Sequence, residues 1–238
     1  MSLSGGKDST AMLLMMLERG EPIHSVVFFD TGWEFPEMLE HIDLLKRRTG
    51  VSVWKLYPRI PFDFRMLHRP VIAKSGQNKG KVHRVGYGWP STMRRWCTRE
   101  KVGQIEYFQK NLPSPVSCIG YAADETHRAK KGSKDTSKRY PLIEWGITEH
   151  QALEYCKSKG YNWGGLYDIF DRVSCFCCPF QNLGSLRKLR HHFPALWERV
   201  LKMDDARPSH NVGFKDYVSV RQLDQRFAEE DRQMKIFA

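Results

Sequence analysis

The stretch Ser4-Gly-Gly-Lys-Asp-Ser9 decides how the first part of this chain folds, because it links Met1-Ser-Leu to a run of helical character. Two glycines let the backbone turn tightly and approach a ligand, and free amides at a helix start attract anions. The loop therefore predicts a pyrophosphate site, in which Lys7 neutralises phosphate charge and Ser4 and Ser9 donate hydroxyl hydrogen bonds. An ordinary glycine-containing turn with a capping Ser or Asp is the alternative.

Helices and strands are expected to alternate after this loop. The patterns predict a helix over 9–19 before Gly20, a buried strand over 23–29, a helix over 37–48 and a strand over 51–56. Crossovers of this length join parallel strands, so the expected fold class is α/β, a doubly wound parallel sheet of Rossmann type. Further elements are expected as a helix over 98–110, a strand over 116–121 and helices over 148–156, 183–192 and 194–203.

The composition fits a folded globular protein. The 238 residues are 41% hydrophobic and 27% charged, which allows a sizeable core and excludes disordered and fibrous classes. The longest apolar run, residues 11–17, is far shorter than the roughly 20 residues of a membrane-spanning helix. The first ten residues show no pattern of a secretory leader, so we expect a cytoplasmic protein without a membrane partner.

Positive charge concentrates in one stretch. The formal net charge is +11, and residues 59–101 hold eleven Lys and Arg against Asp63 and Glu100. Basic groups meet phosphates while rings stack on bases, so the interleaved Tyr87, Trp89 and Trp96 favour a nucleic acid partner. A solvated basic face that binds nothing specific is the alternative.

Five blocks of the sequence carry a family resemblance. SGGKDS resembles the pyrophosphate-binding loop of the ATP pyrophosphatases, the PP-loop or adenine nucleotide alpha hydrolase superfamily. The other four are similar to its phosphoadenosine phosphosulfate (PAPS) reductase branch, and they are FDTGWEFPE (29–37), WCTREKV (96–102), IGYAADETHRA (119–129) and YPLIEW (140–145). The resemblance implies a nucleotide-binding domain over 1–145 with a basic insertion over about 59–101, followed by a helical, cysteine-containing region over 146–238.

The resemblance also implies site residues. ATP would be the bound nucleotide, and the residues expected to bind it are Ser4, Gly5, Gly6, Lys7, Asp8, Ser9, Asp30 and Gly120. Asp30 ends its strand at the carboxyl edge of the sheet, where ligands bind in such folds, and a carboxylate beside the triphosphate would hold Mg²⁺. Asp8 is the second candidate, so Lys7, Asp8 and Asp30 are the expected catalytic residues. An aspartate in a cap or turn is the alternative for each.

A further set of residues is expected near the acceptor substrate. The family match places Asp124, Glu125 and Arg128 near the nucleotide or the acceptor, and surface pairing of Glu125 with Arg128 is the plain alternative. Arg94 and Arg95 of the basic stretch complete the expected acceptor site.

Cys175-Phe-Cys-Cys places three thiols within four residues. Clustered cysteines in a reducing compartment hold metals more often than they form disulfides. With Cys97 of a family block as a distant fourth ligand, we expect Cys175, Cys177 and Cys178 to bind a [4Fe-4S] cluster, with the choice between Cys177 and Cys178 open. A Zn²⁺ site and a buried apolar group are the alternatives. Cys118 and Cys156 are expected in the core.

Two features distinguish the sequence from true sulfonucleotide reductases. Such enzymes resemble one another in a C-terminal cysteine that attacks sulfur, and no cysteine follows Cys178 here. In addition, Lys7 belongs to the pyrophosphatase version of the loop. The strand that usually precedes this loop is almost absent, so either a shortened strand suffices or the native start lies upstream of Met1.

The expected function is that of an ATP pyrophosphatase in sulfur transfer, such as tRNA thiolation or DNA phosphorothioation. It would adenylate an acceptor oxygen, so that sulfur can replace it, and release pyrophosphate and AMP. The expected partners are ATP, a nucleic acid acceptor (tRNA or DNA), and a sulfur donor such as a cysteine desulfurase. A reductase of adenylyl sulfate or PAPS and a non-catalytic nucleic-acid-binding module are the alternatives.

Overall fold

The computed structural model describes residues 1–129, 135–208, 213–215 and 217–236. By its internal contacts the chain forms two units, one of residues 1–58 with 100–173 and one of residues 59–99 with 174–238. The basic insertion predicted over 59–101 therefore belongs, up to residue 99, to the same unit as the C-terminal helices. The domain boundary predicted at residue 145 stays a prediction.

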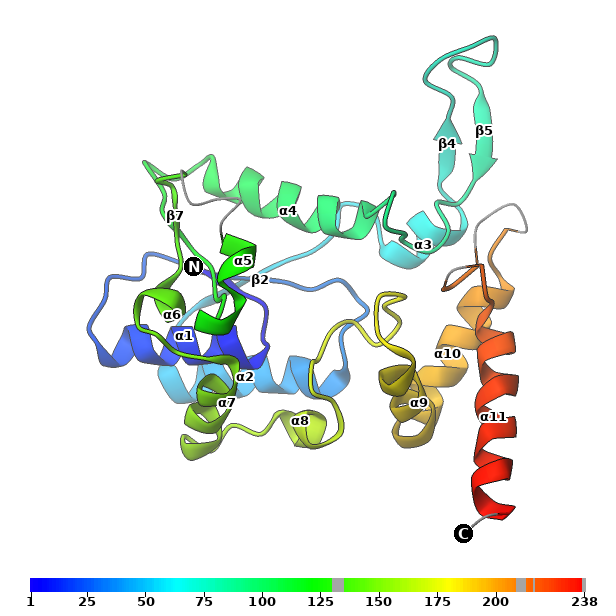
Figure 1. Cartoon of the computed structure of the whole chain (residues 1–238). Helices are drawn as coiled ribbons and strands as arrows, with labels where there is room; N and C mark the ends of the chain where they lie inside the picture. Colours follow the sequence, from blue (N-terminus) through cyan, green and yellow to red (C-terminus); the bar gives the residue numbers. More distant parts are fainter. Residues whose placement is uncertain (130–134, 209–212, 216, 237–238) are drawn as a thin grey trace. The chain divides into compact units, whose positions relative to one another are not determined.

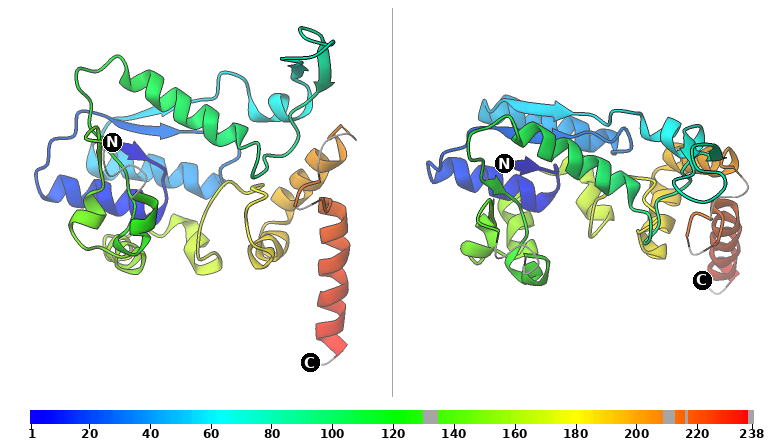
Figure 2. Two further views of the ribbon diagram at one scale, coloured as in Figure 1. Left: turned by 45° about the horizontal axis from the view of Figure 1, so that its top comes forward. Right: turned by 90° about the horizontal axis from the view of Figure 1, so that it is seen from above.

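A parallel sheet forms the centre of the first unit (Figure 1). Strand β2 (Val26–Phe29) pairs with β1 (Ser2–Leu3) on one side and with β3 (Val53–Leu56) on the other. The strands run in the same direction (Figure 2), so their carboxyl ends meet at one edge. This edge is where the loop after β1 and the loop after β2 begin.

A second pair of strands extends this arrangement. Strand β6 (Ser117–Cys118) pairs in parallel with β7 (Lys138–Arg139). A parallel bridge joins Ile119, directly after β6, to Ser2 of β1. The end of β6 therefore lies beside the start of the loop that follows β1.

Helices cover both faces of the sheet. All four side chains of β2 are buried, which a strand achieves only when both faces are covered. Helices α1 (Lys7–Glu18) and α2 (Pro36–Thr49) lie on one side and α4 (Trp96–Gln109) on the other (Figure 1). The predicted doubly wound α/β class is confirmed.

Helix α7 (Glu149–Ser158) packs beside α1. Its start is capped by Thr148, whose hydroxyl accepts from the Gln151 amide while the Gln151 side chain accepts from the Thr148 amide. The fully buried Cys156 thiol of α7 donates to the Lys7 carbonyl oxygen at 3.6 Å. The short helices nearby are η1 (Ala123–Glu125), α5 (Thr126–Ala129), α6 (Pro141–Glu144), η3 (Trp163–Gly165) and α8 (Leu166–Ile169).

The second unit contains the helical region that was predicted at the C-terminal end. Helix α9 (Leu183–His192) matches its predicted range, α10 (Pro194–Asp205) ends two residues beyond the predicted 194–203, and α11 (Val220–Ile236) is an additional helix. Arg190 of α9 contacts two carboxylates of α11, Asp224 at 2.7 Å and Asp231 at 2.9 Å. These ion pairs hold α9 against α11.

Residues 59–95, most of the expected basic insertion, contain regular structure. They form helix α3 (Phe62–Leu67) and an antiparallel hairpin of β4 (Pro70–Ile72) and β5 (Val82–Val85). The hairpin strands are largely exposed, so they lack the apolar alternation from which a half-buried strand is predicted. Within the described residues, no helix is both long and apolar enough to cross a membrane.

Candidate functional site

The loop Ser4–Ser9 is closed on itself by hydroxyl groups. The Ser4 and Ser9 hydroxyl oxygens lie 3.0 Å apart, the Ser4 amide donates to Ser9 Oγ at 3.2 Å, and Ser9 Oγ donates to the Gly6 carbonyl at 3.1 Å. Gly5 has a φ of +82°, which disfavours side chains, and a Cβ there would lie 2.5 Å from Met38 Sδ. The turn is therefore formed before any ligand arrives.

The first turn of α1 presents amide groups at this loop. The amides of Asp8 and Ser9 have no acceptor within the helix, because the first turn of any α-helix leaves such donors without a partner. The Lys7 amide donates to the Tyr167 hydroxyl at 2.8 Å. The Asp8 and Ser9 amides, together with the positive end of the helix dipole, suit an anion such as a phosphate.

Buried aromatic residues support the loop from below. The Trp163 indole donates to the Gly5 carbonyl at 2.7 Å, and the His41 ring stacks on Trp163 with centroids 4.5 Å apart. His41 Nε2 lies 2.9 Å from the Thr10 hydroxyl, and burial lowers the pKa of His41 to about 3. The ring is therefore neutral, and its role is to hold the Gly5 turn in place.

Lys7 stands between two carboxylates. Its Nζ lies 2.5 Å from Glu149 Oε2 and 3.3 Å from Asp8 Oδ2, and Lys7 is only 5% exposed. Burial alone would raise the pKa of Glu149, but the hydrogen bond and charge of Lys7 hold that pKa below its usual value. Without a nucleotide, Glu149 and Asp8 thus neutralise the positive charge of Lys7, with which a bound phosphate would otherwise pair.

Asp8 is the carboxylate of this group that burial affects most. Burial raises the pKa of Asp8 to about 6, against the attraction of Lys7 and with added repulsion from Glu149 and Glu125. Asp8 Oδ1 is buried and has no hydrogen-bond partner among the described residues. An ionised Asp8 therefore destabilises the folded protein when no cation is bound.

Asp8→Asn should make the protein more stable at neutral pH. The pKa of Asp8 rises from 3.8 to about 6 on folding, so the folded protein favours the protonated carboxyl. Wild type therefore has its full stability below about pH 4 and loses stability as the pH rises through 6 and Asp8 ionises. The free energy of unfolding of the variant, relative to that of wild type, should therefore be larger at pH 7.5 than at about pH 4 by on the order of 2–3 kcal/mol. Urea denaturation at the two pH values, without nucleotide or magnesium, measures this difference.

The exposed Asp171→Asn substitution is the matched control for the loss of a carboxylate. If the advantage of Asp8→Asn over wild type were the same at both pH values, the interpretation of Asp8 as a buried, destabilising carboxylate would be wrong.

Asp30 and Gly120 follow β2 and β6, the two strands on either side of β1. Asp30 directly follows β2, and its Oδ1 accepts the Gly32 amide at 2.8 Å in a local turn. A Cβ on Gly120, just beyond β6, would lie 3.0 Å from Ser9 Cα and 3.1 Å from Ser9 N. The β6 end therefore approaches the loop so closely that a side chain at Gly120 would require the Ser9 backbone to shift by a few tenths of an ångström.

The three residues after Gly120 that were assigned to the acceptor have partners within the first unit. Asp124 accepts the Glu149 amide with both carboxylate oxygens, at 3.1 and 3.3 Å. Glu125 is 8% exposed and pairs with Arg128 at 2.6 Å and with Arg172 at 3.8 Å. The alternative to an acceptor role for these residues, an ion pair of Glu125 with Arg128, is thus present. Glu125 is also close enough to Asp8 to raise its pKa.

The cysteines predicted to bind metal all lie in the second unit. Cys175 and Cys178 bracket a turn in which the Cys178 amide donates to the Cys175 carbonyl at 3.1 Å. Burial raises the pKa of the Cys97, Cys177 and Cys178 thiols. The negative charge of Cys97 raises the pKa of Cys178 further, because like charges repel. No group of three or more His, Cys, Asp or Glu side chains in the described part of the chain is placed to hold a metal ion.

Comparison with protein families agrees with this geometry. A model of the phosphoadenosine phosphosulfate reductase domain matches residues 1–181, a span that includes the loop, Asp30, Gly120 and the cysteine turn. The chain belongs to this family. The PAPS reductase family is part of the PP-loop, or adenine nucleotide alpha hydrolase-like, superfamily and binds nucleotides.

Two relatives of this PAPS reductase-family chain are uncharacterized proteins. One, from Methanocaldococcus jannaschii, is 29% identical over 230 residues, which cover 89% of this chain and 42% of that protein. The other, a 37.8 kDa protein in the gpa 5′ region of Escherichia phage 186, is 29% identical over 111 residues, which cover 47% of this chain and 28% of that protein. The chain thus spans less than half the length of either relative.

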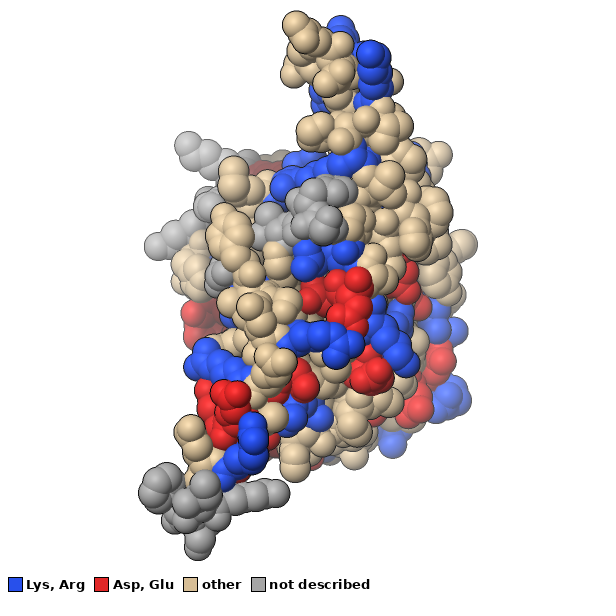
Figure 3. All heavy atoms as spheres, turned by 90° about the vertical axis from the view of Figure 1, so that its right-hand side faces the viewer, with Lys and Arg blue, Asp and Glu red and all other residues tan. Residues whose placement is uncertain are grey.

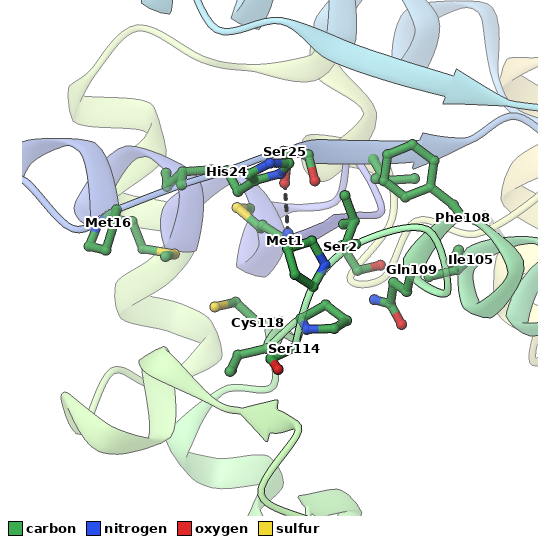
Figure 4. A pocket seen from close by; sticks show the side chains of 17 residues that line it. Met1, Ser2, Met16, His24, Ser25, Ile105, Phe108, Gln109, Ser114 and Cys118 are labelled. Atoms are coloured by element: carbon green, nitrogen blue, oxygen red, sulfur yellow. Dashed lines mark hydrogen bonds between the residues drawn. The ribbon is translucent and has the colours of Figure 1, made fainter.

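A cavity of about 240 Å³ in the first unit lies away from the PP-loop (Figure 4). It opens at the amino ends of the strands, where the Met1 amino group donates to the Ser25 carbonyl at 2.7 Å and Cys118 lines the wall. Ligands of doubly wound sheets bind at the carboxyl ends of the strands. This cavity is therefore not where the family fold would place a nucleotide.

Sequence reasoning missed Glu149, Tyr167 and Trp163, which contact the PP-loop, and His41, which supports it through Thr10 and Trp163. Glu149 is separated from Lys7 by 142 residues and Tyr167 by 160, so no short motif joins them. The aromatic-rich segment 161–167 was the one available signal.

Proposed function

We propose that this PAPS reductase-family chain is an ATP pyrophosphatase that adenylates a nucleic acid acceptor for sulfur incorporation. The observation that carries the proposal is the preformed loop after β1, with the Lys7 ammonium group held between Glu149 and Asp8 and with the Asp8 and Ser9 amides without partners in the helix. Lys7 can exchange Glu149 for a phosphate oxygen, because both are anionic acceptors of the same donor.

In the proposed reaction, an acceptor oxygen attacks the α-phosphorus of ATP. The bond from the α-phosphorus to the bridging oxygen breaks, and pyrophosphate leaves with the electron pair. Lys7 and the Asp8 and Ser9 amides would stabilise the negative charge on this leaving group. A sulfur nucleophile from a separate donor then displaces AMP from the adenylated acceptor.

The carboxylates near the loop fit a magnesium ion. Mg²⁺ takes one or two protein carboxylates together with substrate phosphates, so a complete protein cage is not required. Asp8 Oδ1, buried and without a partner among the described residues, is an oxygen ligand of the required kind, and Asp30 follows the neighbouring strand. The ion would neutralise phosphate charge, while Asp8 and Asp30 would fix its position.

Release of pyrophosphate and AMP from ATP, measured with sulfide as the sulfur donor and with or without RNA or DNA, tests this function. Formation of both products only when the acceptor is present supports the proposal. Release of sulfite from adenylyl sulfate or PAPS in the presence of a thiol reductant, without pyrophosphate from ATP, would establish the reductase alternative instead.

The cysteines are proposed to bind a [4Fe-4S] cluster, with zinc as the alternative. Cys97 and Cys175 to Cys178 belong to one unit, and the charges of Lys215 and Arg95 act on Cys178. Positive charge favours an anionic cluster of thiolates. Since the thiols form no ready ligand group in the described residues, binding would require their side chains to turn toward one another.

Serine at Cys97, Cys175 or Cys178 should remove most of the iron from protein purified under anaerobic conditions, because an alkoxide replaces a thiolate ligand poorly. Iron and acid-labile sulfide per chain, with the visible spectrum, measure this. Cys118→Ala and Cys156→Ala, which alter buried cysteines of the first unit, are the controls and should keep the iron. Zinc without iron after expression with ample iron would contradict the cluster.

A further inference from the structure

A groove of about 640 Å³ opens on the surface of the second unit. Aromatic and other apolar side chains line much of it, and two of them are almost fully exposed: Met93 at 91% and Tyr217 at 84%. Phe180, directly after the cysteine turn, lines the groove and is 41% exposed. Large apolar side chains gathered in this way on a surface mark a binding site more often than a solvated face.

The groove also carries positive charge that the described part of the protein does not neutralise. Arg94 lines the groove, and the Arg95 guanidinium lies over the Phe180 ring at 4.8 Å. Among the described residues, neither Arg94 nor Arg95 has a carboxylate within salt-bridge distance, and the same is true of Arg84. Burial lowers the pKa of Arg84, and the nearby charge of Arg94 lowers it further.

Other arginines of the same unit are paired with acids. Arg190, Arg199 and Arg207 each contact an aspartate at 2.7 to 3.0 Å. Figure 3 shows the same contrast, with blue and red side by side low on the face and blue without red over the hairpin. Arginines brought together without acids are unfavourable unless an anion joins them.

We propose that this groove binds an unpaired segment of a nucleic acid, with phosphates at Arg94, which lines the groove, and at Arg84 and Arg95 near it, and with bases stacked on Phe180 and Tyr217. The volume falls within the range of about 300–1,000 Å³ that is usual for small-ligand sites, so it accommodates a nucleotide. Rings reach the faces of bases only when these are unstacked, which favours a single strand over a duplex. The inference rests on the proposed function for the role of the strand as acceptor, but binding is measured without ATP.

The test uses the full chain and a fluorescent single strand of about 12 nucleotides, within the site sizes of known single-strand binders. Fluorescence anisotropy should show at least about tenfold tighter binding of the single strand than of the corresponding duplex. Phe180→Ala and Tyr217→Ala should each weaken binding about fivefold or more, the lower limit for loss of one stacked base. Arg94→Ala should weaken binding and reduce the slope of log affinity against log salt by about 1.

Matched controls separate the groove from general charge and surface effects. Lys202→Ala removes one charge from an exposed position of α10, and Tyr107→Ala removes an exposed ring from the first unit. Tyr217→Phe keeps the ring and should bind as wild type does. Equal affinity for single strand and duplex, or equal effects of Phe180→Ala and Tyr107→Ala, would overturn the proposal.

The two proposals fail in different ways. Selective binding of the single strand without any pyrophosphate release would overturn the proposed function and leave the groove as a binding site. Acceptor-dependent pyrophosphate release with unchanged strand affinity in the Phe180 and Tyr217 variants would overturn the groove alone.

Discussion

Replacement of Lys7 by alanine should lower the rate of pyrophosphate release by about two orders of magnitude or more. Lys7 is the ammonium group of the loop, and charge on the leaving pyrophosphate increases in the transition state. Loss of a cation that stabilises such charge typically costs about 100-fold or more in rate. Release of labelled pyrophosphate from ATP with saturating acceptor measures the effect, and Asp30→Asn should lower the rate by a similar factor.

Stability must be followed in the same variants. Lys7 is buried against Glu149 and Asp8, so its removal leaves two carboxylates without their cation and should lower the melting temperature. Lys7→Met, which keeps most of the side-chain volume, separates loss of charge from loss of packing. Lys46→Ala, at a more exposed position on α2, is the control and should retain both activity and stability. Near-wild-type turnover of folded Lys7→Ala would remove Lys7 from the reaction.

Gly120→Ala should reduce pyrophosphate release at least about tenfold and destabilise the protein by about 1–3 kcal/mol, the usual cost of adding a methyl group to a packed interior. The new Cβ would lie 3.0 Å from Ser9 Cα and 3.1 Å from Ser9 N. These are backbone atoms of the first turn of α1, which cannot move without displacing the loop. A small shift there changes the positions of the amides and of Lys7 together.

Gly103→Ala is the matched control, because a Cβ at that position in α4 would have open space around it. Alanine in a helix is favoured over glycine, so this variant should be unchanged or more stable by about 0.5–1 kcal/mol. Steady-state kinetics and thermal unfolding of both variants measure the difference. If Gly120→Ala behaved as Gly103→Ala does, the close contact between the β6 end and the loop would have no functional importance.

Much of the first unit could be predicted because its signals are local. The glycine pair before Lys7 specifies a turn that leads into a helix, and the apolar run of β2 specifies a strand covered on both faces. Asp30 was placed at the carboxyl edge by the same reasoning, since parallel strands end together. The prediction that Cys118 and Cys156 are buried is confirmed. This prediction also depended on a local signal, because both residues lie in segments with a strand or helix pattern.

The partners of the loop depend instead on how distant segments pack. Lys7 meets Glu149 because α7 packs near α1, and the Gly5 carbonyl meets Trp163 because the segment 161–167 packs there too. Both partners lie more than 140 residues from the loop along the chain. Burial selects these partners, because a buried ammonium group or carbonyl must find an acceptor or donor wherever the fold provides one. Likewise, only the tertiary structure joins residues 59–99 to 174–238, bringing Arg94 of the earlier segment and the exposed rings of Phe180 and Tyr217 from the later one to one groove. Neither segment alone has a pattern that specifies the other, since their contact depends on the return of the chain to residues 59–99 after residues 100–173 of the first unit.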